Sequence, residues 1–276
     1  MTNQVKIKSS KTSLKKTQNN ILSIQFSLDG FSFCVSDSNS KETLYFSEIL
    51  FEKQLNDLEE LLEEIINIFK DNATLHLEYQ EVFVIHQNNL NTIVPESYFD
   101  EKLLRNYLNF NIKVLQTDFI TFDTIQEINA KNVYIPYINI NNYLFQNFGG
   151  FEYKHHSTIF IEKLMKKNQP QEKTMFVNVS ERNIDVVILQ YEKLLFSNSF
   201  LFNTKEDFIY YILFVSEQLQ LDNKVFKLYF VGEINTTSGL YQITYKYVKN
   251  VNFLESNNPI FKEINCEKHS NYLLLG

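Results

Sequence analysis

The chain has 276 residues, of which 44% are hydrophobic and 21% charged, and it contains 25 Phe and 16 Tyr but no Trp. This length accommodates two packed domains, and the composition is that of a globular protein rather than a disordered or fibrous one. The formal net charge of −7 argues against a general nucleic-acid binder and excludes DNA as a predicted partner, because such proteins present an excess of Lys and Arg to phosphates.

Residues 1–20 are basic and contain no acidic residue. Their lysines are Lys6, Lys8, Lys11, Lys15 and Lys16. The pattern predicts a disordered, solubilising arm, and binding of RNA or an anionic membrane through these lysines is the alternative. The arm lacks the apolar core of a secretory signal, and the longest apolar run, residues 208–215, is too short to cross a bilayer. The chain is therefore predicted to be cytoplasmic, without an integral membrane segment.

Residues 21–168 are predicted to form a first lobe that opens with three antiparallel strands, since apolar residues alternate and Asp29-Gly30 is a two-residue hairpin turn. The predicted elements in chain order are strands 21–28, 31–37 and 43–50, a helix 52–70, strands 75–79 and 81–86, a helix 96–108 after Pro95, a strand 133–138, a helix ending near 149–150, a strand 151–154 and a helix to about 167 capped by Ser157 or Thr158. His155-His156 could form a metal or acid–base pair, but adjacent strand residues point to opposite faces, which favours a polar junction.

Residues 169–173 form the clearest linker, and the same pattern restarts in a second lobe predicted over 174–256. Its predicted elements are strands 174–180, 184–191 and 194–202, a helix 205–221, a strand 227–232, a helix 238–247 and a strand 250–254. Residues 208–215 are apolar nearly all round, which predicts a helix sandwiched between two layers. Residues 257–276 are predicted to pack back on the first lobe. Two three-strand meanders that each feed helices predict an α/β fold with a mixed five-stranded sheet in each lobe.

Two hairpins, at residues 22–35 and 176–189, repeat one pattern of strand, polar break and strand. In each, an amide residue stands two positions before a serine: Gln25 and Ser27, then Asn178 and Ser180. This arrangement resembles the actin, sugar-kinase and chaperone ATPase superfamily, whose members carry Asp-x-Gly at these places and clamp the phosphates of ATP with them. Residues 228–233 stand where that superfamily has its adenosine motif, and they keep one of its two glycines, Gly232.

The resemblance implies a two-lobed, actin-like fold built from a duplicated ribonuclease-H-like unit. The chain is most similar to an uncharacterised bacterial family with this fold and degenerate nucleotide motifs, for which the resemblance implies no established activity. In active members the two aspartates bind Mg²⁺ through its waters, whereas an amide is neutral and cannot act as a base. A serine forced into a glycine-like backbone conformation costs on the order of 1–3 kcal/mol.

The sequence therefore predicts a degenerate nucleotide cleft with no catalytic residue, no metal and no cofactor, and with ATP and Mg²⁺ binding disfavoured. Its predicted lining residues are Gln25, Ser27, Asn178, Ser180, Arg182 and Gly232. The two hairpin turns are expected to face each other, with Gln25 and Asn178 buried and hydrogen-bonded to backbone atoms, because an unsatisfied buried amide is costly.

Two functions are compatible with these losses. The favoured one is a non-catalytic pseudo-ATPase that acts as a cytoplasmic protein-interaction platform for an unidentified protein partner. The alternative is a diverged kinase or nucleotide-dependent transferase, in which Ser27, Ser180, Arg182 and Gly232 would contact an anionic ligand between the lobes.

Overall fold

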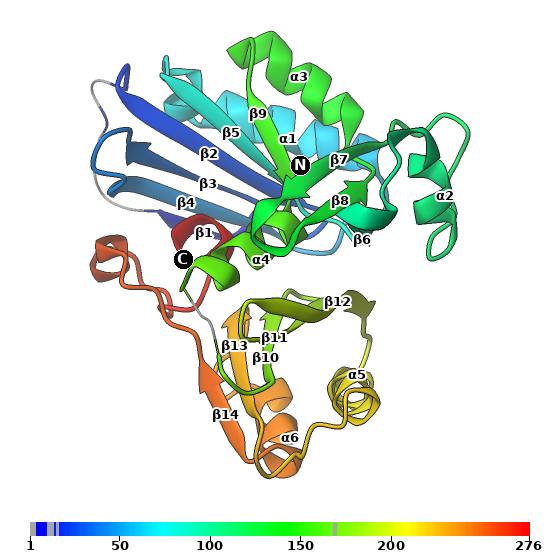
Figure 1. Ribbon diagram of the computed structural model, residues 1–276. Coiled ribbons are helices and arrows are strands. Elements are labelled where there is room, and N and C mark those ends of the chain that lie inside the picture. Colours follow the sequence, from blue (N-terminus) through cyan, green and yellow to red (C-terminus); the bar gives the residue numbers. More distant parts are fainter. Residues whose placement is uncertain (1–3, 10–13, 15–16, 168–169) are drawn as a thin grey trace.

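The computed structural model describes residues 4–9, 14, 17–167 and 170–276. They form two lobes, with helix α4 (His156–Lys167) between them (Figure 1). Among the described residues no helix combines the length and the apolar character that crossing a membrane requires.

Each lobe contains a mixed sheet with the same topology. In the first lobe the order is β4-β3-β2-β5-β9, and in the second it is β12-β11-β10-β13-β14. The first set is β2 (Asn20–Ser27), β3 (Gly30–Asp37), β4 (Thr43–Phe51), β5 (Glu81–His86) and β9 (Glu152–His155), and the second is β10 (Thr174–Val179), β11 (Asn183–Gln190), β12 (Lys193–Leu201), β13 (Lys227–Gly232) and β14 (Asn250–Phe253). In both, an antiparallel meander is followed by two parallel strands. This topology confirms the predicted α/β fold with duplicated meanders.

The sheet of the first lobe has a sixth strand, β1 (Gln4–Ser9), which pairs antiparallel with the outer edge of β4. The prediction of a disordered arm is therefore wrong for residues 4–9. Lys6 and Lys8 lie in this strand, and Lys11, Lys15 and Lys16 lie outside the described residues. Residues 4–8 do alternate apolar and polar side chains, but the basic charge favoured a solvated arm over an edge strand.

An insert between β5 and β9 carries a three-stranded antiparallel sheet that the sequence predicted poorly. Its order is β6 (Asn91–Pro95), β8 (Ala130–Tyr134) and β7 (Thr121–Ile125). The helix predicted over 96–108 is broken into η2 (Glu96–Tyr98), η3 (Glu101–Leu103) and α2 (Leu104–Asn109). The break lies at Asp100, whose side chain accepts a hydrogen bond from the Lys102 N–H and starts a new turn. The strand predicted over 133–138 ends earlier, before Pro136, which lacks the N–H of a ladder residue.

Two further boundaries in the first lobe differ from prediction for local reasons. Helix α1 (Leu58–Asp71) begins six residues late because the Asp57 side chain accepts hydrogen bonds from the N–H groups of Glu59 and Glu60 and so caps it there. Of the residues predicted as a strand over 75–79, the first two belong to the 3-10 turn η1 (Ala73–His76) and the others are not in a strand. Helix α3 (Ile138–Phe148) packs beside α1 over one face of the sheet (Figure 1).

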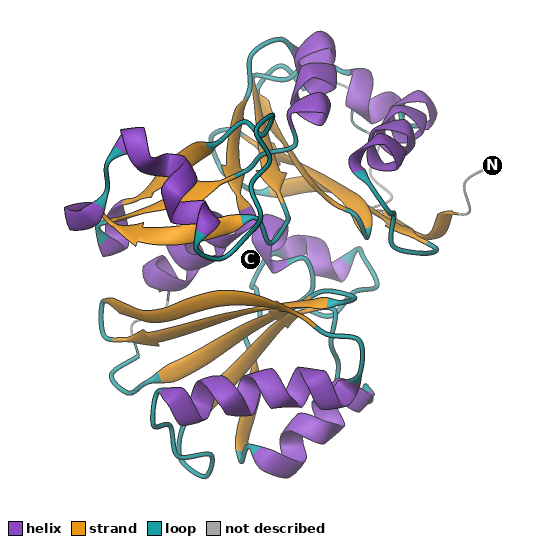
Figure 2. Ribbon diagram, turned by 90° about the vertical axis from the view of Figure 1, so that its right-hand side faces the viewer, coloured by secondary structure: helices purple, strands orange, loops and turns teal. Residues whose placement is uncertain are grey.

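Helices α5 (Lys205–Gln218) and α6 (Gly239–Tyr247) cover one face of the second sheet (Figure 2). Helix α5 buries Phe208, Ile212 and Val215 against the strands. Its other side leaves Tyr210 58% and Phe214 42% exposed. The prediction that residues 208–215 lie between two layers is therefore wrong for that side of the helix.

The lobes share an apolar core to which α4 and the C-terminal segment contribute. Phe160 and Leu164 of α4 pack with Phe176 and Val187 of the second sheet and with Tyr272 of α7 (Tyr272–Leu275). The 3-10 turn η5 (Pro259–Lys262) lies against β4 of the first lobe. The C-terminal segment thus contacts both lobes and holds them at one end of the space between them.

Candidate functional site

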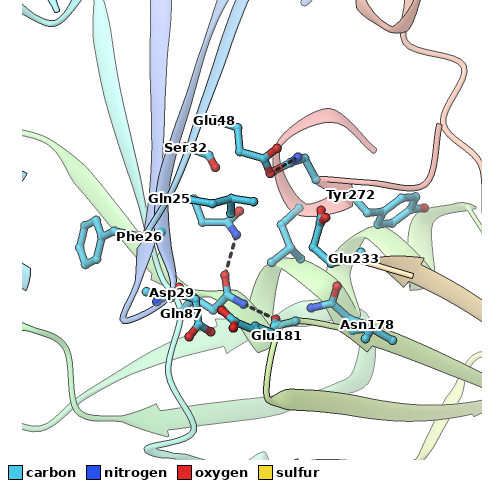
Figure 3. Close-up of a pocket in the computed structure, with 18 of the residues that line it drawn as sticks. Gln25, Phe26, Asp29, Ser32, Glu48, Gln87, Asn178, Glu181, Glu233 and Tyr272 are labelled. Atoms are coloured by element: carbon cyan, nitrogen blue, oxygen red, sulfur yellow. Dashed lines mark hydrogen bonds between the residues drawn. The ribbon is translucent and has the colours of Figure 1, made fainter. Parts of the chain in front are cut away.

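A cleft of about 460 Å³ lies between the lobes where the two hairpins approach each other (Figure 3). The end of β2, the end of β10 and the end of β13 reach it, because parallel strands deliver their carboxyl ends to one edge of a sheet. Five of the six predicted residues line it: Gln25, Ser27, Asn178, Ser180 and Gly232. Arg182 does not, and lines a neighbouring cavity of about 510 Å³ together with Lys53 and His156.

One side chain, Gln87, joins the two hairpins across the cleft. The Gln25 Nε2 donates to Gln87 Oε1 over 2.7 Å, and Gln87 Nε2 donates to the Ser180 Oγ over 2.8 Å (Figure 3, dashed lines). The backbone fixes Gln87 in place, since its N–H donates to the carbonyl of Phe26 in β2. Gln87 was not predicted as a site residue. Its position directly after β5, the strand that runs parallel to β2, is the signal that could have found it.

The two amides are held by side chains, which corrects the expectation of backbone partners. Gln25 is half-buried and bonds to Gln87. Asn178 is buried, and its Nδ2 donates to Asp185 Oδ2 over 2.9 Å. The reason is the register of the second hairpin, which places Asn178 directly opposite Asp185, where cross-strand side chains are in reach of each other.

Asp185 is the centre of a buried polar network on the second hairpin. Its Oδ1 accepts from Asn183 Nδ2 at 3.0 Å and from Ser199 Oγ at 2.6 Å, and the His156 Nε2 lies 3.1 Å from the same oxygen. Burial acts to raise the pKa of Asp185, but the His156 charge and the hydrogen bonds outweigh it and hold that pKa below its ordinary value. Asp185 is therefore an ionised, fully engaged carboxylate that anchors α4 of the first lobe to β11 of the second.

His155 and His156 have separate partners, although β9 ends between them and their ring centroids lie 4.4 Å apart. The His155 Nε2 is 3.0 Å from the carbonyl of Asn88, and its Nδ1 accepts from the Ser157 N–H. Burial, with the neighbouring charges of His156 and His86, holds the pKa of His155 well below its ordinary value. In the part of the chain that the structure describes, no group of three or more His, Cys, Asp or Glu side chains could hold a metal ion.

Gly232 has a backbone conformation, φ +86°, that L residues rarely adopt. A Cβ on it would lie 2.2 Å from the carbonyl oxygen of Val179 and 2.9 Å from Asn178 Oδ1. The Gly232 N–H donates to the carbonyl of His269, and the next N–H, of Glu233, donates to Val179. The glycine is thus required by the close approach of the protein's own backbone.

The cleft is lined by four carboxylates, and none of the described residues that line it is Lys or Arg. The four are Asp29, Glu48, Glu181 and Glu233. Burial raises the pKa of Asp29 to about 6 from an ordinary 3.8, and the charge of Glu181 adds to the rise, against a hydrogen bond with Gln54 and the charge of Arg182. Like charges 4 Å apart near a protein surface repel by about 4 kcal/mol, so this lining opposes a polyphosphate.

Replacing Asp29 by asparagine should stabilise the protein in a pH-dependent way. Because the folded pKa is about 6 and the ordinary value 3.8, the unfolded chain ionises first, and Asp29 lowers the free energy of unfolding as the pH rises from about 4 to 6. Above pH 6 we expect Asp29→Asn to gain about 1–2 kcal/mol, the lower figure allowing for its partial exposure. Urea denaturation at pH 7.5 and pH 4 measures this gain.

The gain should vanish at pH 4, and the exposed Asp71→Asn should show no such pH dependence. A stabilisation by Asp29→Asn that is the same at both pH values would contradict the argument.

A model of the family described as "Protein of unknown function (DUF3822)" matches residues 9–251, and no curated protein matches the chain. Among solved structures, the chain is similar to a Bacteroides thetaiotaomicron protein with actin-like ATPase fold and unknown function, at 22% identity and a TM-score of 0.78 over 86% of this chain and 91% of that one. It is also similar to a chain of the PilM–PilN type IV pilus biogenesis complex, at 12% identity and a TM-score of 0.55 over 85% and 88% of the two chains. The fold is therefore the actin-like ATPase fold.

Proposed function

Because the chain belongs to the DUF3822 family, whose function is unknown, we propose its function from the site itself: a non-catalytic, cytoplasmic, actin-like protein that binds another protein. The observation that supports this proposal most directly is the hydrogen-bonded bridge from Gln25 through Gln87 to Ser180. A triphosphate clamped by the two hairpins would have to break both hydrogen bonds of this bridge.

Three further features of the cleft support the loss of turnover. Neutral amides stand at the places of the metal-binding aspartates, and Asn178 is already engaged by Asp185. Serines replace the glycines whose N–H groups would turn to phosphate. The carboxylates that line the cleft repel an anionic ligand, and Arg182, the one basic residue predicted there, lines the adjoining cavity instead.

The insert offers a surface on which a protein partner could dock. Within residues 96–120 several large apolar side chains are exposed: Tyr98 at 76%, Leu103 at 42%, Phe110 at 86%, Leu115 at 54% and Phe119 at 52%. Such a concentration of exposed apolar side chains is a common mark of a protein-binding site. The similar chain of the PilM–PilN complex assembles with another protein, which supports a binding role for the same fold by analogy.

Calorimetry with ATP and with ADP in the presence of Mg²⁺ tests the first half of the proposal. We expect no binding tighter than about 0.1 mM, which corresponds to about 5.5 kcal/mol, and no ATP hydrolysis by the wild type or by the Gln25→Asp, Asn178→Asp double variant. Tighter binding would favour the diverged kinase or transferase instead.

Affinity capture tests the second half. Wild-type protein should retain a partner from a native lysate and Phe110→Ser should lose it. Phe145→Ser should keep the partner, since Phe145 is 62% exposed but lies on α3, outside the apolar surface of residues 96–120. Recovery of the wild type without any other protein, or equal loss in both variants, would count against the platform role.

A further inference from the structure

Strand β12 is an open edge of the second sheet. Among the described strands it pairs with β11 alone, and it lies on the side of the molecule that Figure 2 turns toward the viewer. The Phe202 N–H donates to the carbonyl of Arg182, the residue that directly precedes β11. Because the backbone groups of a strand alternate between its two sides, those of Ser197, Ser199 and Leu201 point outward, away from β11.

This edge lacks the usual protection against pairing. It is nine residues long, and its single charged residue is Lys193, at its start. Natural edge strands are commonly short, charged or interrupted by proline. The other edge of the same sheet, β14, has four residues.

The sequence of β12 is symmetric about Asn198. Residues 195–201 read Leu-Phe-Ser-Asn-Ser-Phe-Leu in either direction. If two copies pair antiparallel with Asn198 at the two-fold axis, Ser197 lies opposite Ser199 of the second copy and Phe196 lies opposite its Phe200. In this register the hydrogen-bonded pairs are those of residues 197 and 199, and these are the residues whose backbone groups point outward. Side-chain symmetry thus selects a register that the outward backbone groups can pair in.

A row of aromatic rings continues from the edge strand onto the uncovered side of α5. Phe196 stacks with Phe200 at 6.4 Å between ring centroids, Phe200 with Tyr211 at 4.6 Å, and Tyr211 contacts Tyr210 at 5.5 Å. Tyr210 in turn stacks with Phe214 at 5.9 Å. Large aromatic side chains such as Phe and Tyr dominate the energetics of protein interfaces. A second copy paired along β12 would bring its own row of aromatic rings next to this one.

We propose that the chain forms a two-fold symmetric dimer in which the β12 strands of two copies pair antiparallel about Asn198 and join their two sheets. The occupant of the edge is a second copy because the register of the palindrome matches the strand to itself. In the single chain the Ser199 N–H donates to the Asn198 side-chain oxygen over 2.9 Å, and in the dimer it donates to the carbonyl of Ser197 in the second copy. This interface is independent of the interlobe cleft and of the insert.

Sedimentation and light scattering of the full chain at micromolar concentration test the dimer. We expect a mass of twice 32.8 kDa for the wild type. Asn198→Lys places two charges face to face at the axis and should weaken the dimer about tenfold or more. Ser197→Pro should do the same, because it removes an outward N–H and leaves the ladder with β11 intact. The matched control is Asn252→Lys, an exposed asparagine on the opposite edge strand β14, and it should remain dimeric.

A monomeric wild type would overturn the proposal, and so would Asn198→Lys and Asn252→Lys proteins of equal dimer affinity. If Asn198→Lys does not fold, Asn198→Cys in a Cys266→Ser background decides the question. Under mild oxidation it should cross-link to itself, since the axial pair brings the two Cβ atoms together, whereas Asn252→Cys should not. Equal cross-linking of the two cysteine variants would also overturn the proposal.

Discussion

Replacing Asp185 by alanine should lower the free energy of unfolding by about 3–5 kcal/mol, the cost of breaking a buried ion pair by removing one partner. The carboxylate accepts from Asn178, Asn183 and Ser199 and faces His156. The three donors would lose their acceptor, and His156, which is fully buried, would lose the carboxylate beside it. Urea denaturation at pH 7.5 measures the loss, with Asp71→Ala as a surface control that should change stability by no more than about 0.5 kcal/mol.

The loss should depend on pH. Because folding lowers the pKa of Asp185, the stability that it contributes is fully present above the ordinary Asp pKa of about 4 and is lost as the pH falls through the lowered value. The difference between wild type and Asp185→Ala should therefore shrink in acid. A difference that is below about 1 kcal/mol at pH 7.5 would show that the network does not anchor the two lobes.

A double-mutant cycle identifies the contact between Asn178 and Asp185 within this network. Asn178→Asp puts two carboxylates directly opposite each other in the ladder, where like charges are destabilising. Adding Asp185→Asn restores a donor opposite an acceptor, so the double variant should be more stable than the sum of the single losses by about 1–3 kcal/mol. It will not reach wild-type stability, since His156 still lacks its carboxylate.

The duplicated meanders could be predicted from the sequence because their signals are local. Alternating apolar residues and the Asp29-Gly30 turn fix strands and hairpins, and β13 agrees with its predicted range at both ends. The insert was predicted poorly because its order depends on short caps such as Asp100 and on tertiary contacts that support strands of only five residues. Helix α5 shows the limit of periodicity, because an apolar side chain such as Tyr210 does not tell whether another layer covers it.

The site shows the same division between local and tertiary signals. That Asn178 reaches Asp185 follows from the hairpin register alone, and could have been derived from the turn between residues 180 and 183. The role of Gln87 could not have been derived from the sequence. Its contacts join residues 25, 87 and 180, which come from three separate segments that share no sequence pattern. Composition also did not show that the carboxylates gather in the cleft while Arg182 lines the adjoining cavity.

These contacts give a structural role to the residues that the sequence predicted to line a nucleotide cleft. Gln25 and Ser180 hold the two lobes together through Gln87, and Asn178 satisfies a buried carboxylate that also binds α4.

Gly232→Ala should lower the free energy of unfolding by about 3–5 kcal/mol. The new Cβ would lie 2.2 Å from the Val179 carbonyl oxygen. Steric overlap of this kind destabilises a protein by about 1–3 kcal/mol. The positive φ adds backbone strain of about 1–3 kcal/mol. Relief would come from separating β13 from β10, so hydrogen exchange at the Glu233 N–H, which donates to Val179, should accelerate as well. Thermal and urea denaturation measure the first effect, and amide exchange the second.

Gly239→Ala is the matched control for this prediction. Gly239 is the first residue of α6 and a Cβ there would meet no atom within 4 Å, so the alanine should be neutral or stabilising by up to about 1 kcal/mol. Equal effects of the two variants would contradict the argument. A large loss confined to Gly232→Ala would mean that this glycine is required by Asn178 and Val179 of the chain itself, and hence that its presence needs no bound nucleotide to explain it.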